Sequence, residues 1–362
     1  MKIVEIIPQL NSGGAERFVV DLCNELARTH DVTLVVLHAV DKNGFFCKDL
    51  HKDVRLISMN KSMGLDMKLF FRLALLIKKE HPHIVHTHLN GIMYTLLAYM
   101  CFQNINYVHT VHSDAAKEAG SGIARWCRKL AFKWCKVHPV TISEESQRSF
   151  EEFYHLPSTL IYNGRPAYDG PIDSSVALEM QSLKIRKEAK AIVNVARIVE
   201  AKNQLALVQA IDDLNQKGEA IELFLIGAVL NKEIYDAIVQ LHSPYVHLLG
   251  ERANSCDYMQ AADAFCLSSV YEGMPITLIE CFSVGTIPLC TPVGGIINMI
   301  QDGVNGLLAE GTSKRNIENL LRRFCQMDSK TIVEMRKQSR ISFSTFNIKK
   351  CAKKYMQMFE NC

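Results

Sequence analysis

The chain has 362 residues, more than one hydrophobic core usually supports, so two domains are expected. Its composition, 48% hydrophobic and 22% charged, is that of a globular protein and excludes a disordered or fibrous chain. The net charge of +3 argues against bulk binding of nucleic acid.

The charge is unevenly distributed along the chain. Residues 1–165 and 346–362 together hold 24 basic and 17 acidic residues, whereas residues 166–345 hold 17 and 21. This asymmetry suggests a surface on the first part that meets anions, although random variation of surface charge would explain it equally well.

Cysteine usage and apolar runs indicate the compartment. The 12 cysteines are scattered without a C-x-x-C pair, which predicts free thiols in a reducing cytoplasm and no metal site, with a site built from distant residues left open. Glu5 and Pro8 interrupt the first apolar run, so no signal peptide is expected. The longest uncharged apolar stretch, residues 92–102, is too short to span a bilayer. We expect a cytoplasmic protein, with peripheral contact at the inner face of the cell membrane as an option.

Short apolar runs alternate with segments of helical periodicity in two successive series. The first series predicts strands at residues 2–7, 32–37, 84–86, 107–111 and 140–142, and helices at 15–28 and 67–80. The second predicts strands at residues 192–196, 222–226, 246–248, 264–267 and 287–290, and helices at 205–216, 231–241 and 277–284.

This alternation predicts an α/β protein of two doubly wound parallel sheets, that is, two Rossmann-like domains. Glycines and prolines between residues 163 and 182 mark the boundary. The predicted domains are residues 1–165 and 166–345, with the apolar and aromatic residues of 346–362 docking back on the first as a C-terminal helix.

The strongest local motif runs from Ser269 to Glu280 and follows the predicted strand 264–267. It therefore lies at the carboxyl end of a parallel strand, where open α/β sheets bind ligands. Gly273 allows close approach of the backbone, and Pro275 suits a first helical turn, so the amides of Met274, Ile276 and Thr277 would face a phosphate.

Glu272 precedes this predicted helix and Glu280 lies on it. Eight helical steps span roughly 12 Å, which suits a ligand held at two distant hydroxyl groups. The spacing weighs against a retaining glycosidase, whose carboxyl groups lie about 5 Å apart. Taken singly, a carboxylate in such a position is more often a solvated charge, and only the whole motif from Ser269 to Glu280 favours a functional role.

Two cations and a glycine-rich turn follow other strands. Arg197 and Lys202 come after the strand 192–196, where they could stabilise a leaving diphosphate or merely add solubility. Gly13 and Gly14 open the first helix and could hold an anion, but match neither the dinucleotide fingerprint nor the Walker A motif.

Three histidines end neighbouring strands. His112 lies just past the strand 107–111, and His86 and His88 lie at the end of the strand 84–86. A single histidine in such a place is usually structural, so the group of three is suggestive without being decisive.

Taken in order, these motifs resemble the retaining glycosyltransferases of the GT-B fold, family 4 (glycosyl transferases group 1), over essentially the whole chain. The matching positions are Ser12-Gly13-Gly14-Ala15-Glu16, His112, Ile161-Tyr162-Asn163-Gly164, Arg197, Lys202, Gly227, Leu249-Gly250, Glu272 and Glu280 as an E-x7-E pair, Gly285, Pro288, Gly294-Gly295 and residues 302–306. Arg165-Pro166 and Ala228 depart from the usual residues.

The resemblance implies two domains facing across a cleft and a role for each matched position. Arg197 and Lys202 would hold the diphosphate of the donor, Glu280 the ribose, and Glu272 the transferred sugar. The backbone from Gly273 through Met274 and Pro275 to Ile276 would assist Glu272, and Gly227 would line the nucleotide site. Gly13 and Gly14 would lie beside the phosphate and the acceptor, and His112 near the reactive face of the sugar. His112, Arg197, Lys202 and Glu272 are the residues assigned to catalysis.

The same resemblance implies a nucleotide-diphosphate sugar as donor, with a UDP-sugar expected, and no metal or other cofactor. The acceptor would be a lipid-linked glycan of bacterial surface polysaccharide synthesis. A nucleotide-sugar epimerase of similar fold and a non-catalytic sugar-nucleotide-binding protein remain alternatives. The basic and aromatic segment 123–136 could lie on anionic lipid or be a core helix with a solvated face.

Overall fold

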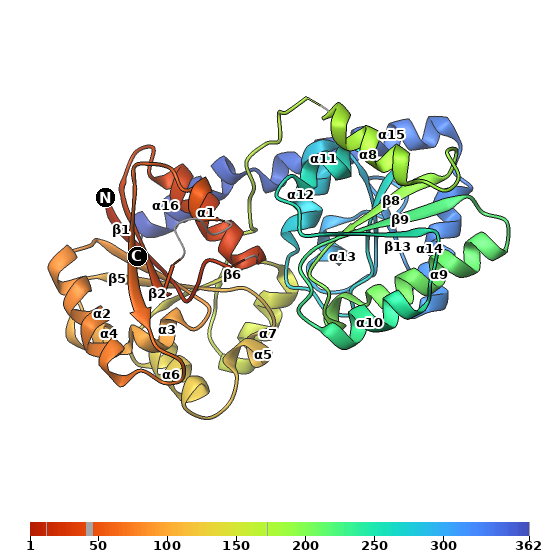
Figure 1. Ribbon diagram of the computed structural model, residues 1–362. Helices are drawn as coiled ribbons and strands as arrows, with labels where there is room; N and C mark the ends of the chain where they lie inside the picture. Colours follow the sequence, from red (N-terminus) through yellow and green to blue (C-terminus); the bar gives the residue numbers. More distant parts are fainter. Residues whose placement is uncertain (12, 41–45, 172, 362) are drawn as a thin grey trace. The chain divides into compact units, whose positions relative to one another are not determined.

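The computed structural model describes residues 1–11, 13–40, 46–171 and 173–361 (Figure 1). Two compact units emerge. The first comprises Met1–Pro166 together with Phe346–Cys362, and the second comprises Ala167–Thr345. Each unit is built on its own parallel sheet, so the predicted α/β class with two doubly wound sheets is confirmed.

The first unit contains a seven-stranded sheet in the order β3-β2-β1-β4-β5-β6-β7. Its strands are β1 (Lys2–Ile7), β2 (Asp31–His38), β3 (Val54–Lys61), β4 (Ile84–His88), β5 (Asn106–Val111), β6 (His138–Thr141) and β7 (Thr159–Leu160). Its helices are α1 (Gly14–Leu26), α2 (Met67–Glu80), α3 (Gly91–Tyr94), α4 (Leu96–Cys101), α5 (Ala115–Ala119), α6 (Gly122–Lys133), α7 (Glu144–Tyr154) and α16 (Ile348–Glu360), with a short 3₁₀ turn at Cys47–Asp49.

The second unit contains a six-stranded sheet in the order β10-β9-β8-β11-β12-β13. Its strands are β8 (Lys190–Val195), β9 (Ile221–Ile226), β10 (Val246–Gly250), β11 (Ala264–Leu267), β12 (Ile287–Cys290) and β13 (Leu307–Leu308). Its helices are α8 (Ser174–Leu183), α9 (Gln204–Gln216), α10 (Lys232–Gln240), α11 (Ser255–Ala261), α12 (Ile276–Val284), α13 (Ile296–Met299), α14 (Lys314–Cys325) and α15 (Ser329–Ser342), with 3₁₀ turns at Glu200–Lys202 and Phe343–Phe346.

The central strands are continuous apolar runs because helices cover both faces of each sheet. In β9, all six residues from Ile221 to Ile226 are buried, including Glu222. The helices are amphipathic instead: α9 buries Leu207, Ile211 and Leu214, which are spaced to lie on one side.

The C-terminal segment returns to the first unit through the stretch around Gly164. The amide of Arg165 donates to the carbonyl of Phe346 at 2.9 Å, and the amide of Ile348 donates to the carbonyl of Arg165 at 2.9 Å. A Cβ on Gly164 would lie 2.8 Å from the Cα of Ile348, so only glycine permits this approach. The Arg165 side chain, a departure from the family pattern, forms an ion pair with buried Asp21 on α1.

In both sheets the strand order reverses beside the first strand. The chain winds one way from β1 through β2 to β3 and then crosses back so that β4 also pairs with β1; β8 and β11 repeat this arrangement in the second sheet. The position where the strand order reverses is called the switch point of the sheet. The loops that follow its two central strands diverge there and leave a crevice for ligands.

Several element boundaries differ from the sequence prediction. Strand β4 continues two residues past His86 and ends at His88, because both histidines are buried and hydrogen-bonded within the sheet. Helix α6 ends at Lys133, so the predicted helix to residue 136 is too long. Pro275 directly precedes α12 and is not part of its first turn. No helix in the described part of the chain is long and apolar enough to cross a membrane.

Candidate functional site

The loops after β8 and β11 meet at the switch point of the second sheet. The Ser268 hydroxyl donates to the carbonyl of Lys202 at 2.9 Å, and the Val270 amide donates to the carbonyl of Ala201 at 2.9 Å. These two contacts join the loop 196–203 to the loop 268–275. The predicted cations and the predicted carboxylate therefore belong to one structural element.

Within this element Lys202 and Glu272 form an ion pair. The Lys202 Nζ lies 2.6 Å from Glu272 Oε1, and the Ser269 hydroxyl donates to the same oxygen at 2.5 Å. The Glu272 side chain is 8% exposed and that of Lys202 is 19% exposed. A carboxylate and an ammonium so placed can orient hydroxyl groups and neutralise phosphate charge, respectively.

The backbone around Glu272 is shaped by a glycine loop after β12. Gly294 has φ +55°, and a Cβ on it would lie 1.9 Å from the carbonyl oxygen of Glu272. The amide of the next residue, Gly295, donates to the carbonyl of Gly273 at 2.7 Å. Glycine is therefore required at position 294 for both its left-handed backbone and its lack of a side chain.

Helix α12 starts beside this loop. The first N–H groups of a helix lack intrahelical acceptors, so those of Ile276 and Thr277 are available to an anion, whereas Pro275 has no N–H. Glu280 lies further along the same helix and is 8% exposed. The two carboxylates of the E-x7-E pair thus flank the start of one helix.

Arg197 and Gly227 lie at the ends of β8 and β9. Arg197 is exposed, and its carbonyl accepts a hydrogen bond from Gln204 Nε2 at 2.9 Å. Gly227 has φ +150°, and a Cβ there would lie 2.1 Å from the carbonyl oxygen of Ala196. Gly227 therefore allows the backbone before Arg197 to approach β9 closely.

In the first unit, Gly13 and Gly14 begin helix α1. Gly13 has an extended backbone, and a Cβ on it would lie 2.3 Å from Oε2 of Glu16. The glycine thus leaves room for the Glu16 carboxylate, which folds back toward the start of the helix. Ser12, part of the same sequence motif, lies outside the described residues.

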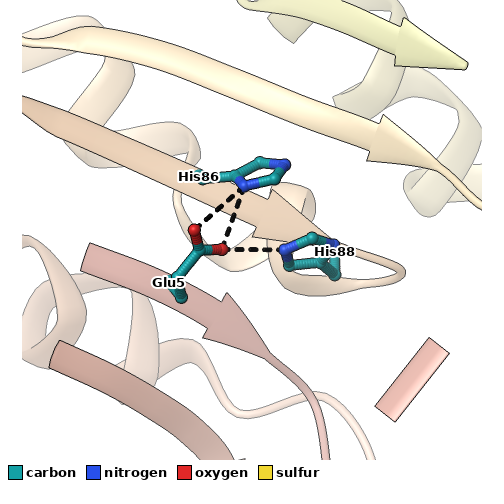
Figure 2. Close-up of side chains that lie close together, drawn as sticks. All are labelled: Glu5, His86 and His88. Carbon is teal, nitrogen blue, oxygen red and sulfur yellow. Dashed lines mark hydrogen bonds and ion pairs between the residues drawn. The ribbon is translucent and has the colours of Figure 1, made fainter. Parts of the chain in front are cut away.

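His112 belongs to a buried polar cluster that the sequence reasoning found only in part. Its Nε2 lies 2.9 Å from His88 Nδ1, and His88 Nε2 lies 2.9 Å from Glu5 Oε2. His86 Nδ1 lies 3.0 Å from the same Glu5 oxygen (Figure 2). Glu5 was missed as a site residue, although a carboxylate inside the apolar strand β1 is a signal that could have identified it.

A second branch of the cluster reaches the C-terminal helix. His86 Nε2 lies 2.7 Å from the Thr110 hydroxyl, which lies 2.9 Å from the Tyr355 hydroxyl on α16. Tyr355 is fully buried and its ring packs 5.1 Å from that of His86. The returning segment therefore completes the polar core of the first unit.

Burial and hydrogen bonding shift the pKa values in this cluster. Burial alone would raise the pKa of Glu5, but interactions with His86 and His88 outweigh it and lower the pKa to about 2. Burial, reinforced by His86, lowers the pKa of His88 to about 3 despite the opposing effect of Glu5. Burial and the neighbouring His88 hold the pKa of His112 well below its ordinary value.

The same cluster has the composition of a metal site. One ligand atom each from Glu5, His86 and His88 lie within 4.8 Å of one another. The sequence predicted no metal site but left open one built from residues distant in the chain. In the structure the carboxylate is hydrogen-bonded directly to both rings, so an ion would have to displace these contacts.

The fold and the site at the switch point of the second sheet define a glycosyltransferase of the GT-B type. Residues 12–166 match the family "Glycosyltransferase Family 4", and residues 176–341 match "Glycosyl transferases group 1". The chain belongs to this family, as the resemblance of its motifs predicted.

Two relatives cover most of the chain. One is an α-1,4-N-acetyl-D-galactosaminyltransferase of Campylobacter jejuni, and its name includes a diphosphoundecaprenol-linked glycan as the substrate. It is 25% identical to this chain over 85% of this chain and 84% of its own length. The UDP-Gal:α-D-GlcNAc-diphosphoundecaprenol α-1,3-galactosyltransferase of Escherichia coli is 26% identical over 87% and 83%.

Solved structures share the fold. HepE of Anabaena in complex with UDP and glucose aligns over 100% of both chains with a TM-score of 0.83 and 19% identity. WaaG, a glycosyltransferase involved in lipopolysaccharide biosynthesis, aligns over 99% of both chains with a TM-score of 0.76 and 15% identity. At these identities the likeness establishes the GT-B fold.

Proposed function

We propose that the protein is a retaining glycosyltransferase that moves a sugar from a UDP-sugar to a lipid-linked glycan in bacterial surface polysaccharide synthesis. The observation that carries the proposal is the Lys202–Glu272 pair, which lies at the switch point beside the start of α12. The names of the two relatives, both acting on diphosphoundecaprenol-linked glycans, support the acceptor class. The UDP in the complexes with HepE supports the nucleotide.

Several matched residues of the second unit have roles in donor binding. Glu280 binds the ribose hydroxyls, and Glu272 binds the transferred sugar together with the backbone from Gly273 to Ile276. Arg197 and Lys202 hold the diphosphate and stabilise the charge that develops as the glycosidic bond breaks. Because two cations and the amides at the start of α12 supply positive charge, the reaction needs no metal ion.

The first unit serves the acceptor. Gly13 and Gly14 lie beside the phosphate and the acceptor, and His112 lies near the reactive face of the sugar. The unit of residues 1–165 with 346–362 is thus the acceptor domain, and residues 166–345 form the nucleotide-sugar domain. The anomeric configuration of the sugar is retained by a front-face mechanism, in which the acceptor attacks from the side of the leaving group. No protein nucleophile is assigned.

Peripheral contact with an anionic membrane fits the surface of the first unit. Helix α2 exposes an apolar stripe of Met67, Phe71 and Leu75, each at least 60% exposed and spaced by four residues. Exposed basic side chains at positions 68, 72, 78 and 79 accompany it. An amphipathic helix with these features lies in the interface of a lipid bilayer.

Helix α6 belongs to the same group of helices, because α2 packs on α4 and α4 packs on α6, and it also exposes aromatic side chains. Trp126 is 60% exposed, and Trp134 just after the helix is 78% exposed. Arg128 does not contribute, since it is buried and donates to the carbonyl of Leu89 at 3.0 Å. The proposed place of action is accordingly the cytoplasmic face of the cell membrane.

A donor panel tests the function. The protein is incubated with UDP-, GDP- and ADP-sugars, with and without an undecaprenyl-diphosphate-linked sugar, and the products are identified by mass spectrometry and NMR of the anomeric proton. Transfer of the sugar with retained configuration, only when acceptor is present, supports the proposal. A changed nucleotide-sugar without acceptor would indicate the epimerase, and binding without any product would indicate the non-catalytic protein.

A further inference from the structure

A chain of two hydrogen bonds connects Glu5 on β1, through His88 on β4, to His112 after β5. His88 uses both ring nitrogens: Nε2 lies 2.9 Å from Glu5 Oε2, and Nδ1 lies 2.9 Å from His112 Nε2. Glu5 and His88 have no exposed surface, whereas His112 is only partly buried. The chain thus leads from the interior of the unit to a residue that solvent reaches.

The protonation states give this chain a direction. The Glu5 carboxylate contacts a ring nitrogen of both His86 and His88, so it is the acceptor at the inner end of the chain. A neutral imidazole ring carries one N–H, and because His88 Nε2 lies 2.9 Å from the Glu5 carboxylate, this is the Nε2–H, which donates to Glu5. His88 Nδ1 then has a lone pair, so the proton between the two rings belongs to His112 Nε2.

The second branch reinforces the acceptor role of Glu5. His86 Nδ1 lies 3.1 Å from Glu5 Oε1 and 3.0 Å from Oε2, so two neighbouring rings hold the carboxylate (Figure 2). His86 is held in turn by Thr110, which contacts Tyr355. The carboxylate cannot rotate away without breaking this network.

His112 is also fixed from its backbone. Its amide donates to Glu118 Oε2 at 2.7 Å, and its ring packs against Phe18 at 5.9 Å between centroids. Within the described ranges, no side chain or backbone group bonds its Nδ1. The neutral ring, protonated at Nε2, therefore has its lone pair on Nδ1.

We propose that Glu5 and His88 are positioning residues that hold His112 as the Nε2–H tautomer, so that its Nδ1 accepts a hydrogen bond from a hydroxyl group of a bound sugar. This deepens the proposed function and rests on it, because that function places His112 near the sugar. The ligand class is a hydroxyl donor, and a carbonyl or phosphate oxygen is disfavoured because neither can donate a hydrogen bond to this lone pair.

A metal ion on Glu5, His86 and His88 is the competing use of the same cluster. An ion bound to His88 Nε2 would remove the proton that determines the direction of the chain. Metal content of the purified protein, measured by plasma mass spectrometry after dialysis without chelator, is the first arm of the test. Stoichiometric zinc or iron would overturn the proposal, and less than a tenth of an equivalent is the expected result.

The second arm reads the tautomer directly in the intact wild-type protein. Two-bond ¹H–¹⁵N correlation spectra of ¹⁵N-histidine-labelled protein distinguish Nε2–H from Nδ1–H rings, and the spectrum of the His112→Asn variant assigns the signals of His112. We expect the Nε2–H pattern for His112 without any ligand. An Nδ1–H pattern would overturn the inference whatever the activity, whereas loss of transfer activity with the Nε2–H pattern present would contradict only the proposed function.

The third arm uses variants of His88. In His88→Gln, the amide can still donate to Glu5 and accept from His112, whereas His88→Leu can do neither. We expect kcat to fall about 10- to 100-fold in His88→Leu and to be largely retained in His88→Gln, in line with the usual effect of removing an outer partner of a functional histidine. Equal activity of His88→Leu and wild type, or an unchanged His112 tautomer in a folded His88→Leu, would overturn the proposal.

Kinetics of the same variants identify which sugar supplies the hydroxyl. If it belongs to the donor, His88→Leu binds the UDP-sugar more weakly but UDP equally well in calorimetry. If it belongs to the acceptor, donor binding is unchanged and the KM for the acceptor rises. Both results support the tautomer argument, and a fall in UDP affinity alone would contradict it, since UDP does not carry the hydroxyl in question.

Discussion

The ammonium of Lys202 lies 2.6 Å from the carboxylate of Glu272, and together they join two loops that are separated by 70 residues in the chain. The cation proposed to bind the diphosphate is thus paired with the carboxylate proposed to bind the sugar. On this proposal, a bound diphosphate would compete with Glu272 for Lys202 and would free the carboxylate to accept hydrogen bonds from sugar hydroxyls.

This competition leads to a first prediction, for the Glu272→Gln variant. Removing the carboxylate charge releases Lys202 and removes repulsion of the diphosphate, so we expect affinity for UDP to be equal to or several-fold above that of wild type. The transfer rate should fall at least about 100-fold, because the sugar loses a charged hydrogen-bond acceptor. Calorimetry with UDP and steady-state kinetics measure the two effects. A large loss of UDP affinity would show that Glu272 does not compete for Lys202.

The second prediction concerns Glu280 on α12. A buried ribose that loses a charge-assisted hydrogen bond should cost roughly 1.5–3 kcal/mol, so Glu280→Ala should weaken UDP-sugar binding about 10- to 150-fold. Glu188→Ala is the control, because Glu188 is exposed and precedes β8 at the opposite edge of the same sheet. Calorimetry at fixed salt concentration measures the UDP-sugar affinity of both variants. Equal donor affinity of the two variants would refute the assignment of Glu280 to the ribose.

The third prediction separates backbone strain from steric contact at Gly294. Gly294→Ala places a Cβ 1.9 Å from the carbonyl oxygen of Glu272, whereas Gly303→Ala, also at positive φ, meets no atom within 4 Å. Both should lose about 1–2 kcal/mol of stability from backbone strain, and Gly294→Ala should lose more. Urea unfolding measures stability and calorimetry measures UDP-sugar affinity. Only Gly294→Ala should lose affinity, since it displaces the loop of Glu272.

The fourth prediction concerns pH and the buried histidines. The pKa of His88 is lowered to about 3 and that of His109 is lowered well below its ordinary value, so the unfolded chain takes up protons near pH 6.5 that the folded protein does not. The stability that these groups contribute is present above about pH 6.5 and is lost as pH falls toward the folded pKa. Each contributes up to about 1.4 kcal/mol per pH unit.

Urea midpoints between pH 7.5 and 5 measure this dependence. The midpoint should decrease steadily below pH 6.5, and the decrease should be shallower in His88→Gln, which lacks one of the buried histidines that titrate on unfolding. A midpoint that is constant over this interval would contradict the buried, neutral state of both histidines. His51→Gln is the matched control, because His51 is exposed and should leave the slope unchanged.

The fifth prediction concerns the apolar stripe on α2. Replacing Phe71 and Leu75 by serine should reduce binding to phosphatidylglycerol vesicles at least about tenfold, because two apolar side chains no longer enter the interface. Val333→Ser, an equally exposed apolar position on α15, is the control and should bind as wild type does. Vesicle co-sedimentation at low and high salt measures the effect. No binding of wild-type protein to anionic vesicles at low salt would refute membrane contact through this surface.

Much of the fold could be predicted because it follows from local patterns. The strands β1, β11 and β12 and the helix α2 have the bounds that alternation and periodicity predicted. Strand β3 was missed, because its sequence mixes polar and apolar residues at an edge where burial is incomplete. Short helices such as α3 and α5 contain too few turns for periodicity to be recognised.

The candidate donor residues could be predicted in position but not in their contacts. Glycine, proline and carboxylate spacing located the motif from Ser269 to Glu280 at the end of a strand. The ion pair with Lys202 depends on the pairing of β8 with β11, which no local pattern specifies. Burial of Arg128, one of the basic residues of the segment 123–136, depends likewise on contacts with residues nearly 40 positions away.

By itself, the sequence determined the class of this protein, since two series of parallel strands, the glycine turns and the E-x7-E pair are properties of consecutive residues. Tertiary structure alone decided that Glu5 meets His86 and His88, which lie 81 and 83 positions further along the chain. The reason is topological: β4 pairs with β1 after a crossover, so a carboxylate inside one apolar strand acquires partners only when the sheet assembles.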